Sequence, residues 1–439
     1  MHVVDPRHQR PGNAGSPERS VTVKRILVLG GGFAGLWSAL GAARAVDRCG
    51  AAPDAVRITL VNRDAYHAIR VRNYEADLSD ARVPLDDVLA PAGVEQVEGE
   101  VMQIDAARAG VLVCTSQGGV RTLGYDRLVC ALGSELVRPP LPGLARWAFD
   151  VDTYTRAVQL DAHLSSLPSL PAGDEGRGTV LVVGAGLTGI ETAMEMPARL
   201  RAIFGGLADA APSMLRVVLA DHNPQVGSDL GDAARPSILQ ALQSQRIDIR
   251  TGVAIAAIDE CGATLASGER IPARTIVWCA GMLAHRLTAQ LPAAQRDALG
   301  RLSVDATMRV CGLPHVFAAG DVAVAPIDDV HGSVMSCQHA RPMGRFAGHN
   351  AAADLLGMPL LALRIERYVT VLDLGPWGAI YLEGWERRVA SVGAEAKRSK
   401  QTINQERIYP PRSHDRRQLL DAAEPTVQAA PVLEGGAPP

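Results

Sequence analysis

The feature that most constrains this chain is a glycine-rich turn that occurs twice, each time directly after a short apolar run. Residues 24–35 read KRILVLGGGFAG and residues 179–193 read TVLVVGAGLTGIETA. In a strand–turn–helix unit of this kind, one glycine turns the chain, one lets the backbone approach a pyrophosphate, and one lets the helix pack on the strand. A single copy also occurs in α/β domains that bind no dinucleotide, but two copies predict two nucleotide-binding domains. The glycines concerned are Gly30, Gly32, Gly35, Gly184, Gly186 and Gly189.

Composition narrows the function classes further. The chain has 439 residues, about three typical domains, and a net charge of −3, which gives no electrostatic footprint for nucleic acid. Its seven cysteines are scattered, with no CxxC pair and no Cys/His ligand spacing. We therefore expect a reducing, cytoplasmic environment, no metal site and no nucleic-acid partner.

The two ends of the chain differ from its middle. Residues 1–20 are polar and lack the apolar core of a secretory signal, and residues 421–439 are rich in Ala, Pro and Gly, so both are predicted to be disordered. No apolar run approaches the ~20 residues that a membrane-spanning helix needs. The protein is thus expected to be soluble or peripheral.

The second strand of each nucleotide-binding unit ends at a residue that usually meets a ribose. Residues 215–221 end at Asp221, whose carboxylate would accept the ribose hydroxyls and repel a 2′-phosphate, which favours NADH over NADPH. The alternative is an ordinary solvated aspartate. Residues 56–62 end at Asn62, so either Asn62 and Arg63 hold the first ribose or Asp64 replaces them.

Further strands are predicted between and after these units. They cover residues 94–104, 110–122, 125–134, 275–280 and 316–321. The pair Gly118-Gly119 predicts a hairpin turn within the second of them. The third ends in a small-residue turn, which lets the backbone approach a flat cofactor.

Five motifs in order carry a family resemblance. They are GGGFAG at 30–35, CALGS at 130–134, GAGLTGIE at 184–191, WCAGM at 278–282 and AAGD at 318–321. Between about Lys24 and Asn350 the chain resembles the pyridine-nucleotide flavoprotein reductases, most closely the type II NADH dehydrogenases. The resemblance implies an α/β fold of two Rossmann-like domains, with FAD in the first and NADH in the second.

The resemblance also implies the domain boundaries. The FAD domain is expected over 21–150 and 284–365, the inserted NADH domain over 151–283, and a divergent C-terminal segment over 366–420. Both cofactors would meet where the carboxyl ends of the two sheets face each other.

The same resemblance implies the site residues. Asp321 would bond the flavin ribityl chain, and Glu191 and Gln338 would lie at the reacting rings as the catalytic residues. For Glu191 the alternative is a glutamate that binds the amides of its own helix N-terminus. The residues expected to bind the cofactors are Gly30, Gly32, Phe33, Ala34, Gly35, Asn62, Arg63, Ala131, Gly133, Gly184, Gly186, Thr188, Gly189, Glu191, Asp221, Ala280, Gly281, Gly320, Asp321, Gln338 and His339.

The electron acceptor is expected beside residues 335–344, MSCQHARPMG, which align with the family's quinone-facing stretch. Pro342 and Met343 stand where the family usually has two glutamines, so an apolar wall with weak, permissive binding is predicted. Cys337 and His339 could form a redox pair, but packing beneath the flavin ring is the favoured interpretation.

The predicted function is hydride transfer from NADH to FAD, followed by electron transfer to a quinone or a similar small acceptor. One alternative is a soluble reductase of a protein acceptor such as ferredoxin; another is a non-enzymatic, NADH-responsive flavin protein. Residues 386–417, with nine basic and four acidic residues, could dock an acidic partner, touch anionic lipid at the inner face of the membrane, or form a solvated face, the favoured interpretation. A homodimer is a further option.

Overall fold

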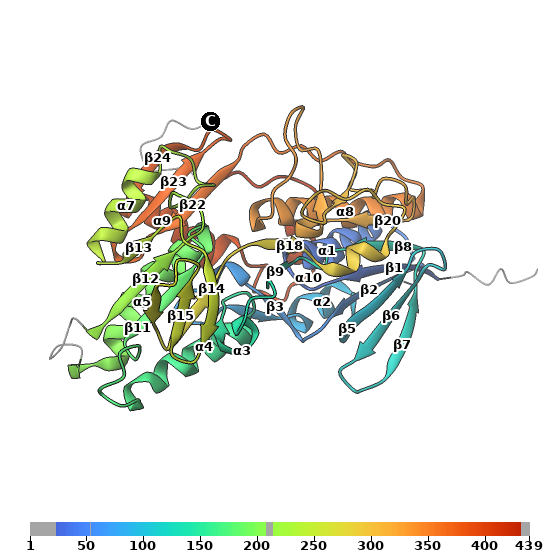
Figure 1. Cartoon of the computed structure of the whole chain (residues 1–439). Coiled ribbons are helices and arrows are strands. Elements are labelled where there is room, and N and C mark those ends of the chain that lie inside the picture. The colour runs from blue at the N-terminus through green and yellow to red at the C-terminus, as the bar shows by residue number, and fades with distance from the viewer. Residues whose placement is uncertain (1–22, 53, 208–213, 432–439) are drawn as a thin grey trace, which may run out of the picture.

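The computed structural model describes residues 23–52, 54–207 and 214–431 (Figure 1). The disordered lead predicted over 1–20 lies outside these residues. Two sheets dominate the fold, each beside one of the glycine-rich turns.

The first sheet has seven strands in the order β20-β8-β1-β2-β5-β6-β7. Neighbours from β20 to β5 pair in parallel, whereas β5, β6 and β7 pair antiparallel. The strands are β1 (Lys24–Leu29), β2 (Val56–Asn62), β5 (Glu95–Asp105), β6 (Gly110–Thr115), β7 (Val120–Gly124), β8 (Arg127–Cys130) and β20 (Val316–Ala318). Residues 26–29 of β1 and 128–130 of β8 are buried, which is why these stretches read as continuous apolar runs.

The second sheet is fully parallel, with the order β10-β17-β11-β12-β13. Its strands are β10 (Ala148–Phe149), β11 (Thr179–Val183), β12 (Arg216–Ala220), β13 (Asp248–Arg250) and β17 (Thr275–Trp278). It lies between β8 and β20 in sequence, and β20 nevertheless returns to the first sheet. The predicted fold class, one Rossmann-like unit inserted in another, is therefore confirmed.

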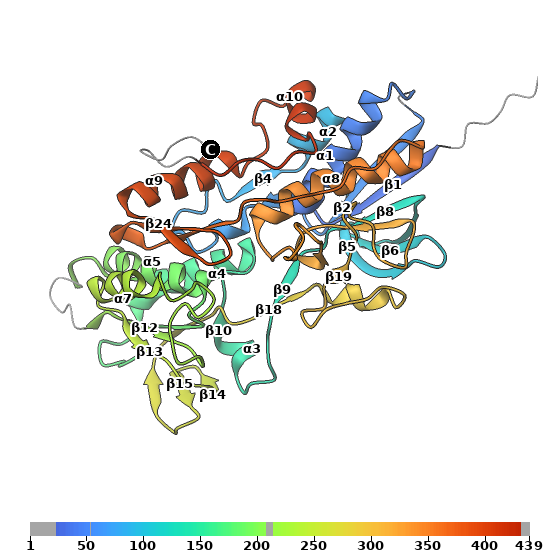
Figure 2. The ribbon, with the colours of Figure 1, turned by 90° about the horizontal axis from the view of Figure 1, so that it is seen from above.

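The two crossings between the sheets run side by side. β9 (Ser134–Leu136) leaves the first sheet, β18 (Met282–Ala284) leaves the second, and the two pair antiparallel. In Figures 1 and 2 this ribbon lies between the two halves of the molecule. The ribbon holds the carboxyl ends of both sheets near each other, which is where parallel sheets bind ligands.

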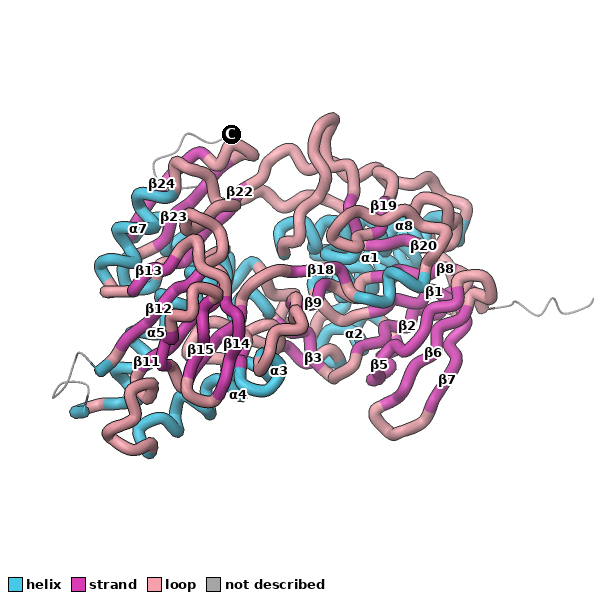
Figure 3. Tube along the Cα trace, viewed as in Figure 1, coloured by secondary structure: helices cyan, strands magenta, loops and turns pink. Residues whose placement is uncertain are grey.

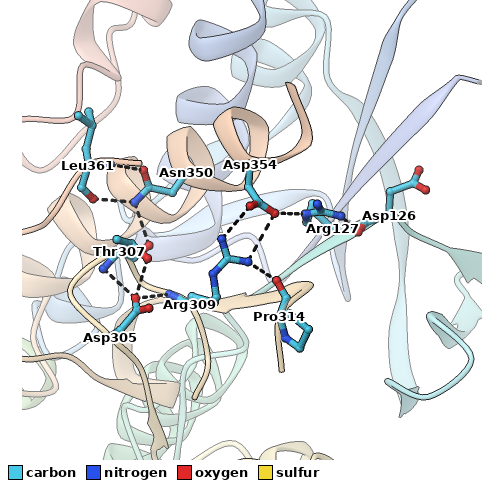
Figure 4. Close-up of polar contacts among 9 residues, drawn as sticks. All are labelled: Asp126, Arg127, Asp305, Thr307, Arg309, Pro314, Asn350, Asp354 and Leu361. Carbon is cyan, nitrogen blue, oxygen red and sulfur yellow. Dashed lines mark hydrogen bonds and ion pairs between the residues drawn. The ribbon is translucent and has the colours of Figure 1, made fainter. Parts of the chain in front are cut away.

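Two helices that pack on each other cover the first sheet. α1 (Phe33–Arg48) and α8 (Cys337–Leu356) pack closely, and an added Cβ at Gly344 would lie 2.3 Å from the Ala34 carbonyl oxygen. Polar contacts fix the C-terminal end of α8 (Figure 4): Asp354 accepts from Arg127 and, at 2.8 Å, from Arg309. The opposite end of α8, at Cys337, is thereby held at the junction of the two sheets.

The C-terminal segment folds onto the second unit rather than standing apart. β22 (Val369–Asp373), β23 (Ala379–Glu383) and β24 (Arg388–Gly393) form an antiparallel sheet, followed by α9 (Ala394–Thr402) and a π-helical turn (Ile403–Arg407). Leu372 and Ile380 share a core with α5 (Leu187–Phe204). Figure 3 shows these strands above the second sheet.

The expected disordered tail differs from the structure over residues 421–431. α10 (Arg416–Ala422) runs into it, Asp421 pairs with Arg48, and Glu424 pairs with Arg44. Ion pairs with α1 thus supply contacts that a composition rich in Ala, Pro and Gly does not reveal. Residues 432–439 lie outside the described part.

The remaining elements border these layers. They are β3 (Tyr66–Ala68), β4 (Arg82–Pro84), α2 (Asp86–Ala92), α3 (Leu144–Trp147), α4 (Tyr154–Ser166), α7 (Arg235–Ser244), β14 (Ile255–Asp259), β15 (Gly262–Leu265), β16 (Arg270–Pro272), β19 (Leu302–Ser303) and β21 (Ala323–Val324).

Candidate functional site

The first glycine-rich loop has room for a ligand at one glycine only. Gly30 has a φ of +99°, and a Cβ there would lie 2.4 Å from the Ala131 carbonyl oxygen. A Cβ on Gly35 would lie 1.7 Å from the oxygen of Gly30, whereas one on Gly32 would meet nothing within 4 Å. Gly32 also begins α1 without a side-chain cap. Open space beside uncapped amides fits a pyrophosphate.

Two side chains hold this loop. The Gly31 amide donates to Asn62 Oδ1 at 2.8 Å, and the Gly31 carbonyl lies 2.8 Å from His67 Nδ1. Asn62 also donates to the carbonyls of Asp64 and Tyr66, so its amide bonds lie within the protein. Burial lowers the pKa of His67 to about 4, and its Nε2 has no partner among the described residues. His67 is therefore neutral and donates from Nδ1.

The second loop repeats this geometry with different partners. Gly184 has a φ of +104°, and a Cβ on Gly189 would lie 1.7 Å from its oxygen. The Ala185 amide donates to Asp221 Oδ2, and the Ala185 carbonyl accepts from the Gly227 amide at 2.9 Å. Asp221 is buried, which excludes the ordinary solvated aspartate. α5 begins at Gly186 without a side-chain cap, so this loop also offers free amides.

Asp321 joins motifs that lie far apart in the sequence. Its Oδ2 accepts from Ser134 Oγ at 2.6 Å, and Ser134 Oγ accepts from Arg70 at 2.8 Å. Arg70 also pairs with Asp152 across the junction of the sheets. A Cβ on Gly320 would lie 2.7 Å from Ala34 Cβ, which places the fifth sequence motif against the first.

Glu191 lies in a buried ion pair with the C-terminal segment. Its Oε1 accepts from Lys400 Nζ at 2.7 Å and from the Asp373 amide at 3.0 Å. These contacts exclude the alternative in which Glu191 binds amides of its own helix N-terminus. Burial raises the pKa of the Glu191 carboxyl, against the opposing effect of Lys400. The Glu191 carboxylate outweighs burial at Lys400 and raises the pKa of its ammonium.

A cavity of about 480 Å³ opens at this pair. Its wall joins α5, the start of α8 and the C-terminal segment, and includes Thr188, Glu191, Gln338 and Lys400. Gln338 donates to the Arg367 carbonyl at 3.3 Å and accepts from the Val369 amide at 3.4 Å. The structure thus brings both predicted catalytic residues to one cavity.

Other predicted residues lie elsewhere. His339 is buried against Tyr368 and does not line this cavity; Arg63 is exposed on the loop after β2. Met343 is fully buried in the core of the first unit, so the predicted apolar wall retains only Pro342 at these two positions. Phe33 packs edge-to-face on His67 at 5.1 Å. Ala131 and Ala280 line the backs of the two loops, and Gly133 and Gly281 have positive φ.

Sequence reasoning missed Lys400, Asp373 and Arg70. The basic stretch 386–417 was predicted to be a solvated face, but Lys400 is buried and Lys397 pairs with Asp373 at 2.5 Å. One signal was available: Lys400 lies in register with Ala396 and Ile403 on the apolar side of α9. A lysine in such a position requires a buried partner.

The comparisons with known proteins agree with this geometry. The family model for pyridine nucleotide-disulphide oxidoreductases matches residues 24–344. The chain belongs to that family. It is therefore an oxidoreductase with the nucleotide loops that distinguish pyridine nucleotide-disulphide oxidoreductases.

Individual members of this family extend the match. An NADH dehydrogenase-like protein of Mycobacterium tuberculosis is 58% identical over 93% of this chain and 100% of its own length. A type II NADH:quinone oxidoreductase of Staphylococcus saprophyticus is 24% identical over 80% of this chain and 88% of its own. A solved structure of NDH2 from Plasmodium falciparum with NADH superposes with a TM-score of 0.73 at 12% identity, over 92% and 98% of the chains. The resemblance to the type II enzymes is confirmed.

Two further observations concern the described residues only. None of their helices has the length and apolarity to cross a membrane. No three His, Cys, Asp or Glu side chains among them gather as a metal site.

Burial raises the pKa of the Cys130 and Cys279 thiols to about 12, so both pack as apolar residues beside the loops.

Proposed function

We propose that the protein is an FAD-dependent NADH dehydrogenase that passes electrons to a quinone or similar small acceptor. The observation that carries the proposal is the cavity at the Glu191–Lys400 pair. Residues of the first unit, the second unit and α8 all line it. The family relatives named NADH dehydrogenase-like and NADH:quinone oxidoreductase support it.

The first unit would hold FAD. The amides at the start of α1 and the open space over Gly32 suit its pyrophosphate, and Asp321 with Ser134 suits the ribityl hydroxyls. Bound there, FAD would supply the two-electron chemistry between NADH and the acceptor. The domain boundaries predicted from the sequence remain part of this proposal.

The second unit would hold NADH. The uncapped amides after Gly186 suit its pyrophosphate, and Asp221, directly after β12, suits the ribose hydroxyls. A buried carboxylate at this position would disfavour the additional phosphate of NADPH.

Lys400, held by Glu191, would supply the proton that quinone reduction requires. Reduction of a quinone to a quinol takes up two electrons and two protons: NADH supplies a hydride, and one further proton is required. The Lys400 ammonium donates to Glu191 Oε1 and lines the cavity, so it can hold a proton close to an acceptor carbonyl. Lys400 would then regain a proton from water in the cavity, while the Glu191 carboxylate holds its amine in place.

The ferredoxin alternative loses its main support. Basic side chains of the C-terminal segment are paired: Arg388 with Glu383, Arg412 with Asp80, and Arg416 with Asp47. At these exposed positions the pairing leaves little free positive charge for an acidic partner. The expected cytoplasmic location, the peripheral membrane contact and the homodimer stay predictions.

The test starts with the purified protein, which should be yellow and release FAD on denaturation. NADH should bleach the flavin under anaerobic conditions, and a short-chain quinone should restore the colour in stopped-flow mixing. Gly32→Val should fold but lose FAD, because its side chain occupies open space intended for the pyrophosphate. Gly173→Val, in an equally open and exposed place, should keep it. Bound FMN, or reoxidation of the flavin by oxidised ferredoxin and by no quinone, would overturn the proposal.

A further inference from the structure

Three arginines line one side of the same cavity. Arg341 and Arg345 lie one turn apart on α8, and Arg407 comes from the π-helical turn after α9. Gln338, at the start of α8, precedes Arg341 by about one helical turn, roughly 5 Å along the axis. Arg341 and Arg345 therefore lie progressively farther along α8 from its start at Cys337.

None of the three pairs with a carboxylate among the described residues. Arg345 donates to the Thr426 carbonyl at 3.3 Å and Arg407 to the Ala429 carbonyl at 2.5 Å. Within the described ranges Arg341 makes no hydrogen bond or ion pair; its guanidinium lies 5.3 Å from the Trp37 ring, and that of Arg345 lies 4.3 Å from it. In the described part of the chain their partners are neutral carbonyls and one ring, so no described anion compensates these charges.

Burial makes this arrangement costly. Arg345 is only 6% exposed, and the Nε atoms of Arg341 and Arg345 have no partner in the described structure. Burial lowers the pKa of both guanidinium groups to about 10, and Arg341 adds repulsion at Arg345. Buried cations are ordinarily paired, so the missing partner is an anion.

The other cations of the cavity show the contrast. Lys400 is paired with Glu191 at 2.7 Å, and Arg70 is paired with Asp152. Arg387, which also lines the cavity, donates to the Thr370 hydroxyl and lies 4.6 Å from the Tyr368 ring. Carboxylates thus balance Lys400 and Arg70, whereas no described carboxylate pairs with Arg341, Arg345 or Arg407. Pro342 also lines the cavity and offers no hydrogen-bond donor.

We infer that the acceptor carries an anionic group, a carboxylate or sulfonate, which Arg341, Arg345 and Arg407 bind while its quinone ring faces Gln338 and Lys400. The inference rests on the proposed function and names the substrate class of that site. It replaces the apolar, permissive wall expected from Pro342 and Met343. The anionic group takes no part in the redox step: electrons and protons go to the ring carbonyls, and the group fixes orientation.

The first experiment compares two acceptors of nearly equal shape. They are a methylnaphthoquinone with a short side chain that ends in a carboxylate, and the methyl ester of the same compound. With the FAD-loaded enzyme and NADH, the acid should have a KM about 10-fold or more below that of the ester, the scale of a charge-assisted hydrogen bond. The advantage should shrink as salt rises.

Variants assign the effect to the arginines. Arg341→Gln and Arg407→Gln should each bring the two KM values towards equality, whereas Arg341→Lys should retain part of the preference because it keeps the charge. Arg345→Gln serves only if its melting temperature matches the wild type, since Arg345 packs on Trp37. Arg121→Gln, at an exposed arginine of β7, should leave the preference intact.

A binding measurement separates this inference from the proposed function. In calorimetry with the oxidised enzyme, a redox-inert naphthalene carboxylate should bind at least 10-fold more tightly than its amide. Binding of the carboxylate without reduction of either quinone would support the anion site and overturn the proposed acceptor. Reduction of both quinones with equal KM values in wild type and variants would overturn the anion site alone.

Discussion

The two glycine-rich loops have the same backbone shape but are held by different chemistry. In the first, the Gly31 amide meets the neutral oxygen of Asn62, and the Gly31 carbonyl meets the His67 ring. In the second, the Ala185 amide meets the Asp221 carboxylate, and the Ala185 carbonyl meets a backbone amide. The turn and its contact with the helix are thus fixed by the glycines, since both loops share those. The side chains that hold each loop differ, so they can give the two loops different charges and different pH dependence.

The largest effect should come from the last glycine of each loop, which lies against the carbonyl oxygen of the first glycine of the same loop. A methyl group in Gly35→Ala or Gly189→Ala would lie 1.7 Å from a backbone oxygen, so each loop should be destabilised by more than about 3 kcal/mol, above the usual cost of overpacking. Gly35→Ala should be colourless. Gly189→Ala should be yellow but be reduced by NADH at least about 100-fold more slowly.

Absorbance of the purified variants and anaerobic stopped-flow mixing with NADH measure these effects, and Gly173→Ala is the control because its added methyl group meets nothing within 4 Å. A yellow Gly35→Ala protein with unchanged stability would contradict this prediction. It would show that the first loop can move its backbone enough to accommodate the methyl group.

The next effect is a pH response confined to the first loop. Because the pKa of His67 is about 4 in the folded protein and about 6.5 when unfolded, the unfolded chain binds more protons between these values. Stability should therefore fall as pH drops from 6.5 towards 4. Between pH 7 and pH 5 His67 should account for about 2 kcal/mol of the loss.

Urea unfolding at both pH values checks this prediction. His67→Gln, whose amide can still donate to Gly31, should lose about 2 kcal/mol less than the wild type on acidification. His315→Gln, at an exposed histidine, should behave as wild type. Equal losses in all three proteins would show that His67 does not couple the first loop to pH.

The smallest effect concerns coenzyme choice at the second loop. Asp221→Asn would give that loop the neutral partner of the first, keeping an acceptor for the Ala185 amide while removing the charge. The preference for NADH over NADPH should narrow by about 1–2 kcal/mol. Flavin bleaching rates with each coenzyme report it.

Asn62→Asp is the matched substitution in the first loop and should leave the coenzyme preference unchanged. If Asp221→Asn reacts with both coenzymes as the wild type does, Asp221 serves the loop alone and not the ribose.

Much of the fold was predictable because its signals are local. β2 has the predicted bounds, β11 is the apolar run before the second glycine-rich turn, and the Gly118-Gly119 turn joins β6 to β7 as expected. Lys400 was not predictable in this way. Its partner Glu191 is 209 residues away, and nine basic residues in one stretch suggest solvent more readily than a buried pair. Arg341 was not predicted because the family pattern points to positions 342 and 343, whereas the helix places the Met343 side chain in the core.

The long separation of Glu191 and Lys400 also governs how the protein is made. At about 5–20 residues per second, a ribosome needs roughly 10–40 s after Glu191 to add Lys400. Throughout that interval the carboxyl group must remain hydrated or carry a proton, because its counter-charge does not yet exist. A chain released early would have both glycine turns but an uncovered hollow between them. The C-terminal segment, which is translated last, therefore completes both the ion pair and the wall of the cavity.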